Sequence, residues 1–332
     1  MSGTPTTHAS ERSIVIVEGK PSASAPYHTL AKALERLGLS VRVVPVGTLG
    51  RGEWRRDLRS ARAIVLLHYQ AFDGYLLSQL AMAVALGVPV IRWWVGTDVL
   101  NVITSRRVWR SALQLDRIVS GNVAVAPHLV EELGSAGIRA RYVPSVLDPE
   151  LEAPDIVSWT NTPRPVLVYL PDSRKAFYGF DEVERAIAAN PDVRFIILAD
   201  RTHSLAGHPN VESLGWVTDM RGVYDRAGCI LRVTEHDGLP RMLMEGVLRG
   251  MYAIYAWPLA GCWMARTPEE IQRALERYRT MAEPNAEGRA AMLALRDSRP
   301  DEQMARIISS ATVSLATRAR ALALAARTGL VG

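Results

Sequence analysis

Short apolar runs alternate with helix-like segments along most of the chain, and this alternation limits the fold more than any other feature. Runs such as 63–68 are short and apolar, which suits strands buried on both faces. The segment 27–37 instead carries Leu and Ala at helical spacing and ends at Gly38. Strands that alternate with helices form parallel βαβ units, so we expect an α/β protein with doubly wound sheets.

The alternation occurs in two blocks. The expected strands are 13–17, 41–46, 63–68, 89–93, 117–120 and 140–143 in the first block, and 166–170, 193–199, 211–214, 229–233 and 252–256 in the second. The expected helices are 27–37, 75–86, 128–133, 181–189, 220–225, 240–249, 269–278 and 301–326.

A proline-rich stretch separates the two blocks, with four prolines between positions 149 and 165. Because 332 residues exceed what one hydrophobic core usually supports, two domains are expected. The predicted organisation is a disordered tail, two Rossmann-like domains with a linker between them, and a C-terminal helix that packs back on the first domain. The ranges are 1–12, 13–150, 151–165, 166–300 and 301–332.

Composition restricts the classes of function. The chain has 39 basic and 34 acidic residues, a net charge of +5, and its two cysteines, Cys229 and Cys262, lie in no metal-binding spacing. A reducing cytoplasm is the simplest compartment, and the polar start lacks a signal peptide. The charge-free run 75–91 contains Gly87 and Pro89, which indicates a helix, a turn and a strand and argues against a membrane span.

Arginines surround two tryptophans, Trp54 and Trp109, in the first block. Such patches suit a peripheral contact with an anionic membrane, here the inner face, or an ordinary arginine-rich surface helix. Nucleic acid is not expected as a partner, because no recognised module accompanies the charge.

The most informative segment is 234–250, where an expected strand leads through an acidic loop into a helix. Asp237 and Glu245 stand eight residues apart in the wording Asp-Gly-Leu-Pro-Arg-Met-Leu-Met-Glu. This segment resembles the acidic pair of the retaining GT-B glycosyltransferases of family 4 and their relatives. The resemblance implies that Asp237 faces the hydroxyls of the donor sugar as a catalytic residue, and that Glu245 binds the ribose of the nucleotide.

The chemistry of these residues agrees with those roles. An ionised carboxylate accepts hydrogen bonds from two vicinal hydroxyls, and Gly238 lets backbone N–H groups approach a diphosphate at a helix N-terminus. Leu239 and Arg241 belong to the same expected donor site. The alternative interpretation is a strand-to-helix loop with solvated acidic residues.

A second resemblance lies in 169–181, where relatives carry basic residues that contact the donor pyrophosphate. Gly179, Phe180 and Asp181 match the start of the family's helix, but Tyr178 stands at the usual Lys position. Arg174 and Lys175 in the preceding loop are the expected replacements, and a solvated basic loop is the alternative.

In the first block, 93–98 resembles the family's loop beside the cleft between the domains. Gly96, Thr97 and Asp98 match it, Val95 replaces the usual His, and Asp98 is a catalytic candidate or a helix cap. The loop with Gly19 and Lys20 corresponds to the glycine-rich loop after the first strand.

The resemblance thus implies a GT-B fold with two Rossmann-like domains facing a central cleft. The implied reaction transfers a sugar from a UDP-, GDP- or ADP-sugar to a glycan, lipid-linked or small-molecule acceptor, with retention and without a bound metal or permanent cofactor. Three alternatives remain open. They are a non-catalytic homologue, a sugar-nucleotide epimerase and an NAD-dependent oxidoreductase, although no G-x-G-x-x-G motif supports the last.

Overall fold

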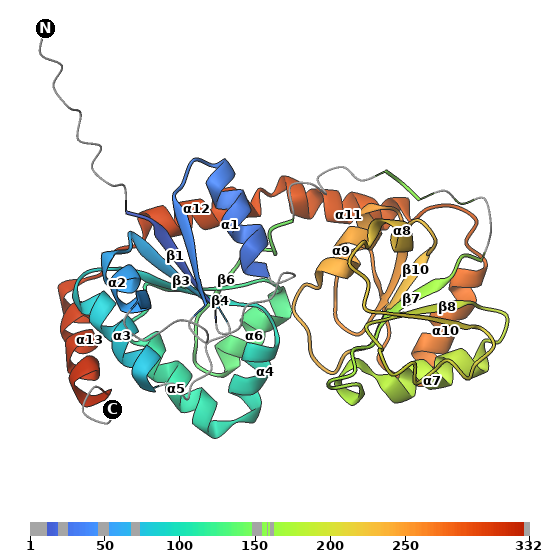
Figure 1. Cartoon of the computed structure of the whole chain (residues 1–332), viewed down its shortest axis with the longest axis horizontal. Helices are drawn as coiled ribbons and strands as arrows, with labels where there is room; N and C mark the ends of the chain where they lie inside the picture. Colours follow the sequence, from blue (N-terminus) through green and yellow to red (C-terminus); the bar gives the residue numbers. More distant parts are fainter. Residues whose placement is uncertain are drawn as a thin grey trace, which may run out of the picture. The chain divides into compact units, whose positions relative to one another are not determined.

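The computed structural model describes residues 12–18, 26–45, 53–67, 74–147, 155–157, 159 and 163–328. These residues form two compact units (Figure 1). The first unit joins Met1–Pro149 to Arg299–Gly332, and the second is Glu150–Ser298. Most of the tail 1–12 and of the linker 151–165 lies outside the described residues.

The described part of the first unit contains a parallel sheet in the order β2-β1-β3-β4-β5-β6. Its strands are β1 (Ile14–Glu18), β2 (Val41–Pro45), β3 (Ala63–Leu67), β4 (Val90–Trp94), β5 (Gly121–Ala124) and β6 (Arg141–Tyr142). Every residue of β1, β3 and β4 is buried. Helices therefore cover both faces of these central strands, which explains their unbroken apolar sequences.

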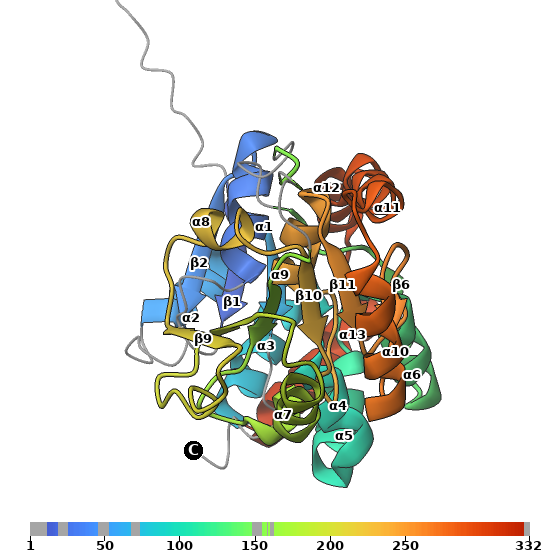
Figure 2. The ribbon, with the colours of Figure 1, turned by 90° about the vertical axis from the view of Figure 1, so that its right-hand side faces the viewer.

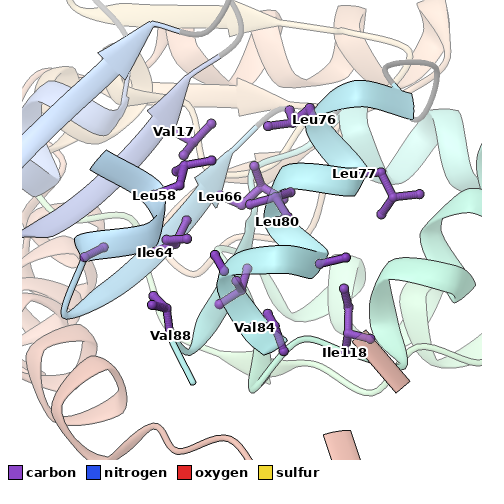
Figure 3. Packing of buried hydrophobic residues seen from close by; sticks show 14 of the residues in the cluster. Val17, Leu58, Ile64, Leu66, Leu76, Leu77, Leu80, Val84, Val88 and Ile118 are labelled. Atoms are coloured by element: carbon purple, nitrogen blue, oxygen red, sulfur yellow. The ribbon is translucent and has the colours of Figure 1, made fainter. Parts of the chain in front are cut away.

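Helices α1 (Pro26–Arg36), α2 (Glu53–Ser60), α3 (Gly74–Ala85), α4 (Thr97–Thr104), α5 (Arg106–Asp116) and α6 (Pro127–Ser135) follow the strands in turn. One core joins α2 and α3 to β1 and β3, through Leu58, Leu80, Val17 and Ile64 (Figure 3). Each buried leucine or isoleucine of this kind stabilises the fold by about 1.5–3 kcal/mol.

The chain returns to the first unit through α12 (Pro300–Ser310) and α13 (Leu315–Thr328). Helix α13 lies along α3 (Figure 1), and its Ala321 and Ala325 are buried in the core just described. Arg318 donates a hydrogen bond to the carbonyl oxygen of Ala85 at 3.1 Å. This contact ties α13 to the end of α3.

The second unit contains a parallel sheet in the order β12-β11-β10-β7-β8-β9. Figure 2 labels β9, β10 and β11 of this sheet. Its strands are β7 (Val166–Tyr169), β8 (Phe195–Leu198), β9 (Val211–Gly215), β10 (Cys229–Arg232), β11 (Tyr252–Tyr255) and β12 (Trp263–Met264). Its helices are η2 (Ala176–Tyr178), α7 (Phe180–Ala189), α8 (Arg221–Tyr224), α9 (Arg241–Leu248), α10 (Pro268–Arg279) and α11 (Ala286–Asp297). One apolar core packs α7 and α10 on the sheet, and another packs α8 on the opposite face.

The expected pair of doubly wound α/β sheets is confirmed, but two expected elements are wrong. Residues 117–120 follow α5 and precede β5: Arg117 is the C-cap of α5, and the N–H of Ile118 donates to the carbonyl oxygen of Leu115. The expected helix 301–326 is two helices, since Ala311 is extended and Ser314 accepts a hydrogen bond from the N–H of Thr317 at the start of α13. Helices α4 and α11 and strand β12 were not expected, and α2 and α5 were expected only as the surface-helix interpretation of the arginine-rich patches.

Among the described residues, every helix falls short of the length and apolar character that a membrane crossing needs.

Candidate active site

The loop 233–240 joins the end of β10 to the start of α9 in the second unit, and neighbouring elements fix it on two sides. The hydroxyl of Tyr255, at the end of β11, donates to the carbonyl oxygen of Gly238 at 3.1 Å. The N–H of Glu235 donates to the carbonyl oxygen of Phe177 at 2.9 Å. Burial raises the pKa of Tyr255 well above its ordinary value, so its hydroxyl remains a donor. These two hydrogen bonds fix the loop backbone without a bound ligand.

Asp237 lies in this loop with its side chain 16% exposed. Its Oδ2 accepts from Arg232 Nε at 2.5 Å and from the hydroxyl of Thr234 at 3.2 Å, and its Oδ1 accepts from the N–H of Gly238 at 3.0 Å. These donors orient an ionised carboxylate at the carboxyl end of β10.

Arg232 is a site residue that the sequence analysis missed. It is the last residue of β10, its side chain is 11% exposed, and its guanidinium lies 5.6 Å from the ring centre of Tyr178 and 5.9 Å from that of Tyr169. Burial lowers the pKa of Arg232, but the charge and hydrogen bond of Asp237 outweigh burial and raise it, so the guanidinium stays charged. The available signal was an arginine ending an apolar strand five residues before the acidic Asp237.

Glu245 lies on α9 and is 8% exposed. Its Oε2 accepts from the hydroxyl of Tyr224 at 2.7 Å, and its Oε1 accepts from Arg241 Nη2 at 3.1 Å. Burial and the neighbouring Glu245 raise the pKa of Tyr224 well above its ordinary value. One protein donor therefore reaches each oxygen, and a carboxylate oxygen can accept a second hydrogen bond from a ligand hydroxyl.

The basic loop after β7 is arranged differently from what the sequence predicts. Lys175 Nζ donates to Asp200 at 2.9 Å, to the Thr202 hydroxyl at 2.6 Å and to the Ser204 hydroxyl at 3.0 Å. Arg174 is exposed, and its guanidinium stacks 3.8 Å from the ring centre of Phe177. Their contact with a pyrophosphate stays a prediction, and Lys175 already has three protein acceptors.

The turn before α7 packs directly against the end of β10. Gly179 has φ +72°, and a Cβ atom there would lie 2.7 Å from Val233. A side chain at this position would collide with the strand, so glycine brings Tyr178 close to Arg232. The residue that stands at the family's Lys position is thereby part of the same cluster.

In the first unit, the loop 95–98 after β4 leads into α4. The Asp98 carboxylate, 7% exposed, accepts from the N–H groups of Val95 at 3.1 Å, Gly96 at 2.8 Å and Val99 at 3.0 Å. Gly96 has φ +143°, and Thr97 is the first residue of α4. Since Gly96 is the N-cap of α4 and has no side-chain cap, Asp98 lies inside the first turn and is not the cap expected as the alternative. Its carboxylate holds the loop through these backbone N–H groups, and its catalytic role stays a prediction. Gly19 and Lys20 lie outside the described residues.

The structure thus brings Asp237, Gly238, Leu239, Arg241 and Glu245 together on one strand–loop–helix of the second unit, whereas Gly96, Thr97 and Asp98 belong to the first unit. Leu239 is 7% exposed and packs inward. Within the described ranges, no group of three His, Cys, Asp or Glu residues is placed to bind a metal ion.

Trp109 belongs to the arginine-rich patch on α5 that was considered for membrane contact. Its indole N–H donates to the carbonyl oxygen of Ala136 at 2.8 Å, so it takes part in the packing of the first unit. The side chain of Trp54 lies outside the described residues.

The sequence matches no family model and no curated protein. The structure is similar to that of Anabaena HepE in complex with UDP and glucose, with a TM-score of 0.65, 15% identity, and coverage of 90% of this chain and 100% of HepE. Sucrose-phosphate synthase from Thermosynechococcus elongatus gives a TM-score of 0.66 and 13% identity, with 89% and 98% coverage. A glycosyltransferase from Rickettsia africae gives 0.56 and 9%, with 96% and 99% coverage.

Two parallel sheets with flanking helices and this similarity over nearly the whole chain confirm the expected fold class. The chain has the GT-B fold.

Proposed function

We propose that the chain is a glycosyltransferase that transfers a sugar from a nucleotide-diphosphate sugar. One observation carries this proposal: Asp237 and Glu245 lie on the same strand–loop–helix, and each carboxylate is held by an arginine, Arg232 and Arg241 respectively. The similar Anabaena HepE was solved with UDP-glucose, which makes UDP-sugars the first donors to test.

In this proposal, Asp237 accepts hydrogen bonds from the hydroxyls of the donor sugar and Glu245 accepts them from the ribose. Arg241 at the start of α9 and the helix N-terminus stabilise the negative charge that develops on the leaving diphosphate. The reaction is retaining and needs no bound metal, as in the glycosyltransferases that segment 234–250 resembles. The enzyme works in the cytoplasm on a glycan, a lipid-linked sugar or a small-molecule acceptor.

The test is calorimetric titration of the wild type and of Glu245→Ala with UDP, GDP, ADP and NAD. We expect one nucleoside diphosphate to bind the wild type and to bind Glu245→Ala at least about tenfold more weakly, since a buried carboxylate that accepts two ribose hydroxyls is lost. Glu184→Ala, an exposed glutamate on α7, is the matched control and should bind like the wild type.

Other outcomes point to other functions. Nucleotide binding without consumption of any UDP-, GDP- or ADP-sugar would favour a non-catalytic homologue, which the tyrosine at position 178 also suits. Binding of NAD alone would replace the transferase with a dinucleotide-dependent enzyme. An epimerase would convert the UDP-sugar without any acceptor.

A further inference from the structure

The Arg232 guanidinium has more hydrogen-bond donors than the protein has acceptors for it. Its Nε donates to Asp237, but among the described residues the structure records no acceptor for its two terminal nitrogens. The nearby rings of Tyr169 and Tyr178 offer their faces and do not replace hydrogen-bond acceptors. The side chain is 11% exposed, and its terminal nitrogens do not belong to the fully buried polar atoms without a partner, so solvent or a ligand in its place can reach them. These nitrogens can therefore bind an acceptor that approaches from the solvent side of the loop.

The position of Arg232 indicates the chemistry of that partner. Arg232 is in register with Tyr255 of β11, at the carboxyl ends of the parallel strands, where α/β sheets bind their ligands. The α9 helix starts beyond the same loop, and the N–H groups of Leu239 and Met242 find no acceptor in the described part of the chain. A guanidinium edge and unpaired amides at a helix N-terminus both favour an anion with several oxygens.

Lys175 and the residue at position 178, where relatives carry a lysine, are less suited to bind an anion. Lys175 donates all three ammonium hydrogens to protein oxygens, and the side chain at position 178 is a neutral tyrosine. Arg232 reaches the same cluster from β10, since its guanidinium lies 5.6 Å from the Tyr178 ring centre. The positive charge is thus present beside residue 178, but it comes from another strand.

We propose that Arg232 is the main diphosphate-binding side chain of the donor site and binds a phosphate with its terminal nitrogens while its Nε holds Asp237. This inference rests on the proposed function, and it adds a phosphate-binding residue that also contacts the proposed catalytic carboxylate. One guanidinium then connects the phosphate end of the donor to the carboxylate proposed to face its sugar. A phosphate bound to Arg232 would hold the guanidinium, and with it Asp237, in the orientation that the structure shows.

The test compares UDP with uridine. Calorimetry measures UDP binding and ligand-observed NMR measures uridine binding, for the wild type, Arg232→Gln, Arg232→Lys and Asp237→Asn. We expect Arg232→Gln to weaken UDP binding by about 10- to 100-fold, the range for losing charge-assisted hydrogen bonds, and to leave uridine binding within about twofold. Arg232→Lys should fall between, because an ammonium keeps the charge without the two-pronged geometry.

Asp237→Asn separates direct binding from an indirect effect. If Arg232 binds phosphate itself, Asp237→Asn keeps UDP binding close to that of the wild type and weakens only the additional affinity gained with UDP-glucose. If Arg232 acts only through Asp237, the asparagine variant loses as much UDP affinity as Arg232→Gln, and the inference is overturned. Arg226→Gln, which removes a guanidinium from an exposed ion pair with Glu212, is the control for a general loss of charge.

The remaining outcomes are also decisive. Arg232→Gln that binds UDP as the wild type does overturns the inference while the proposed function stands. A wild type that binds none of UDP, GDP and ADP overturns both, and this is seen before any variant is made. If the wild type prefers GDP or ADP, the same series is run with that nucleotide and its nucleoside. Unchanged nucleoside binding also shows that each variant is folded.

Discussion

Two pairs of opposite charge lie at the strand ends of the second unit, and their chemistry differs. Lys175, in the loop after β7, pairs with Asp200, which follows β8, and Arg232, at the end of β10, pairs with Asp237. The three ammonium hydrogens of Lys175 reach three protein oxygens, and the Asp200 side chain is fully buried. Arg232 donates to Asp237 through Nε, and within the described ranges its terminal nitrogens have no protein acceptor.

The difference shows that the presence of a basic residue does not identify a phosphate site. A cation whose donors are all satisfied within the protein holds two loops together, and a ligand would have to break those bonds to reach it. A cation with unsatisfied donors gains hydrogen bonds when an anion arrives. The two pairs differ in how many hydrogen-bond donors of the cation have no protein acceptor in the described structure.

Replacing Lys175 tests the satisfied pair, Lys175 with Asp200, in which protein oxygens accept all the ammonium hydrogens, and it has the largest expected effect on stability. Lys175→Met leaves the Asp200 carboxylate buried without its cation, so we expect the free energy of unfolding to fall by about 2–4 kcal/mol. This is less than the full cost of breaking a buried pair, because Thr202 and Ser204 still donate hydrogen bonds to Asp200. Urea denaturation measures this change. UDP affinity should change by less than about threefold.

The neighbouring Arg174→Met is the matched control, because Arg174 is exposed and stacks on Phe177. It should cost less than about 1 kcal/mol. If Lys175→Met instead keeps the stability of the wild type and loses UDP binding, Lys175 belongs to the donor site and the comparison between the two pairs fails.

The alternation of strands and helices predicted the fold because parallel strands buried on both faces must be apolar throughout, as β1 and β3 are. The same signal misled at Ile118, since a buried residue at the end of a helix is as apolar and β-branched as one in a strand. The break before α13 depends on the cap at Ser314, which one serine within a long helical pattern does not reveal.

The site was predictable only where its residues are close in sequence. Asp237 and Glu245 share one strand–loop–helix, so their spacing carries the information. The partner of Lys175 is 25 residues further along the chain, and no local pattern connects it to Asp200. Arg232 looks like a solvated strand end in the sequence, and only the packing of Tyr178 and Tyr169 around it shows that it is enclosed.

The acid dependence of stability tests the satisfied pair in a second way. Although burial raises the pKa of Asp200, hydrogen bonds from Ser204, Lys175 and Thr202 outweigh it and hold that pKa far below its ordinary value. A group with a lowered folded-state pKa stabilises the fold above its unfolded pKa of about 3.9, and this stabilisation is lost as the pH falls below that value.

Between about pH 4 and pH 2, the unfolded wild type binds up to one more proton at Asp200 than the folded protein does. We therefore expect Asp200→Asn to lower the slope of unfolding free energy against pH in this range by up to about 1.4 kcal/mol per pH unit. Urea denaturation at pH 5, 4, 3 and 2 measures the slope. The exposed Asp219 provides the control, because Asp219→Asn should keep the wild-type slope more closely. An unchanged slope in Asp200→Asn would mean that the carboxylate is not strongly held in the folded protein.

Tyr224→Phe has the smallest expected effect and removes one of the two side-chain donors to Glu245. In the described structure each oxygen of Glu245 accepts one side-chain hydrogen bond, so Glu245 is partly satisfied by the protein and can still accept from a ligand. Loss of the tyrosine hydroxyl should lower the free energy of unfolding by about 1 kcal/mol and weaken UDP binding by about two- to fivefold, since Arg241 still orients the carboxylate. Tyr252→Phe, which removes an exposed hydroxyl bonded to the Glu283 carbonyl, is the matched control. A loss of UDP binding as large as that of Glu245→Ala would show that Tyr224 alone orients Glu245, and unchanged affinity would show that Arg241 suffices.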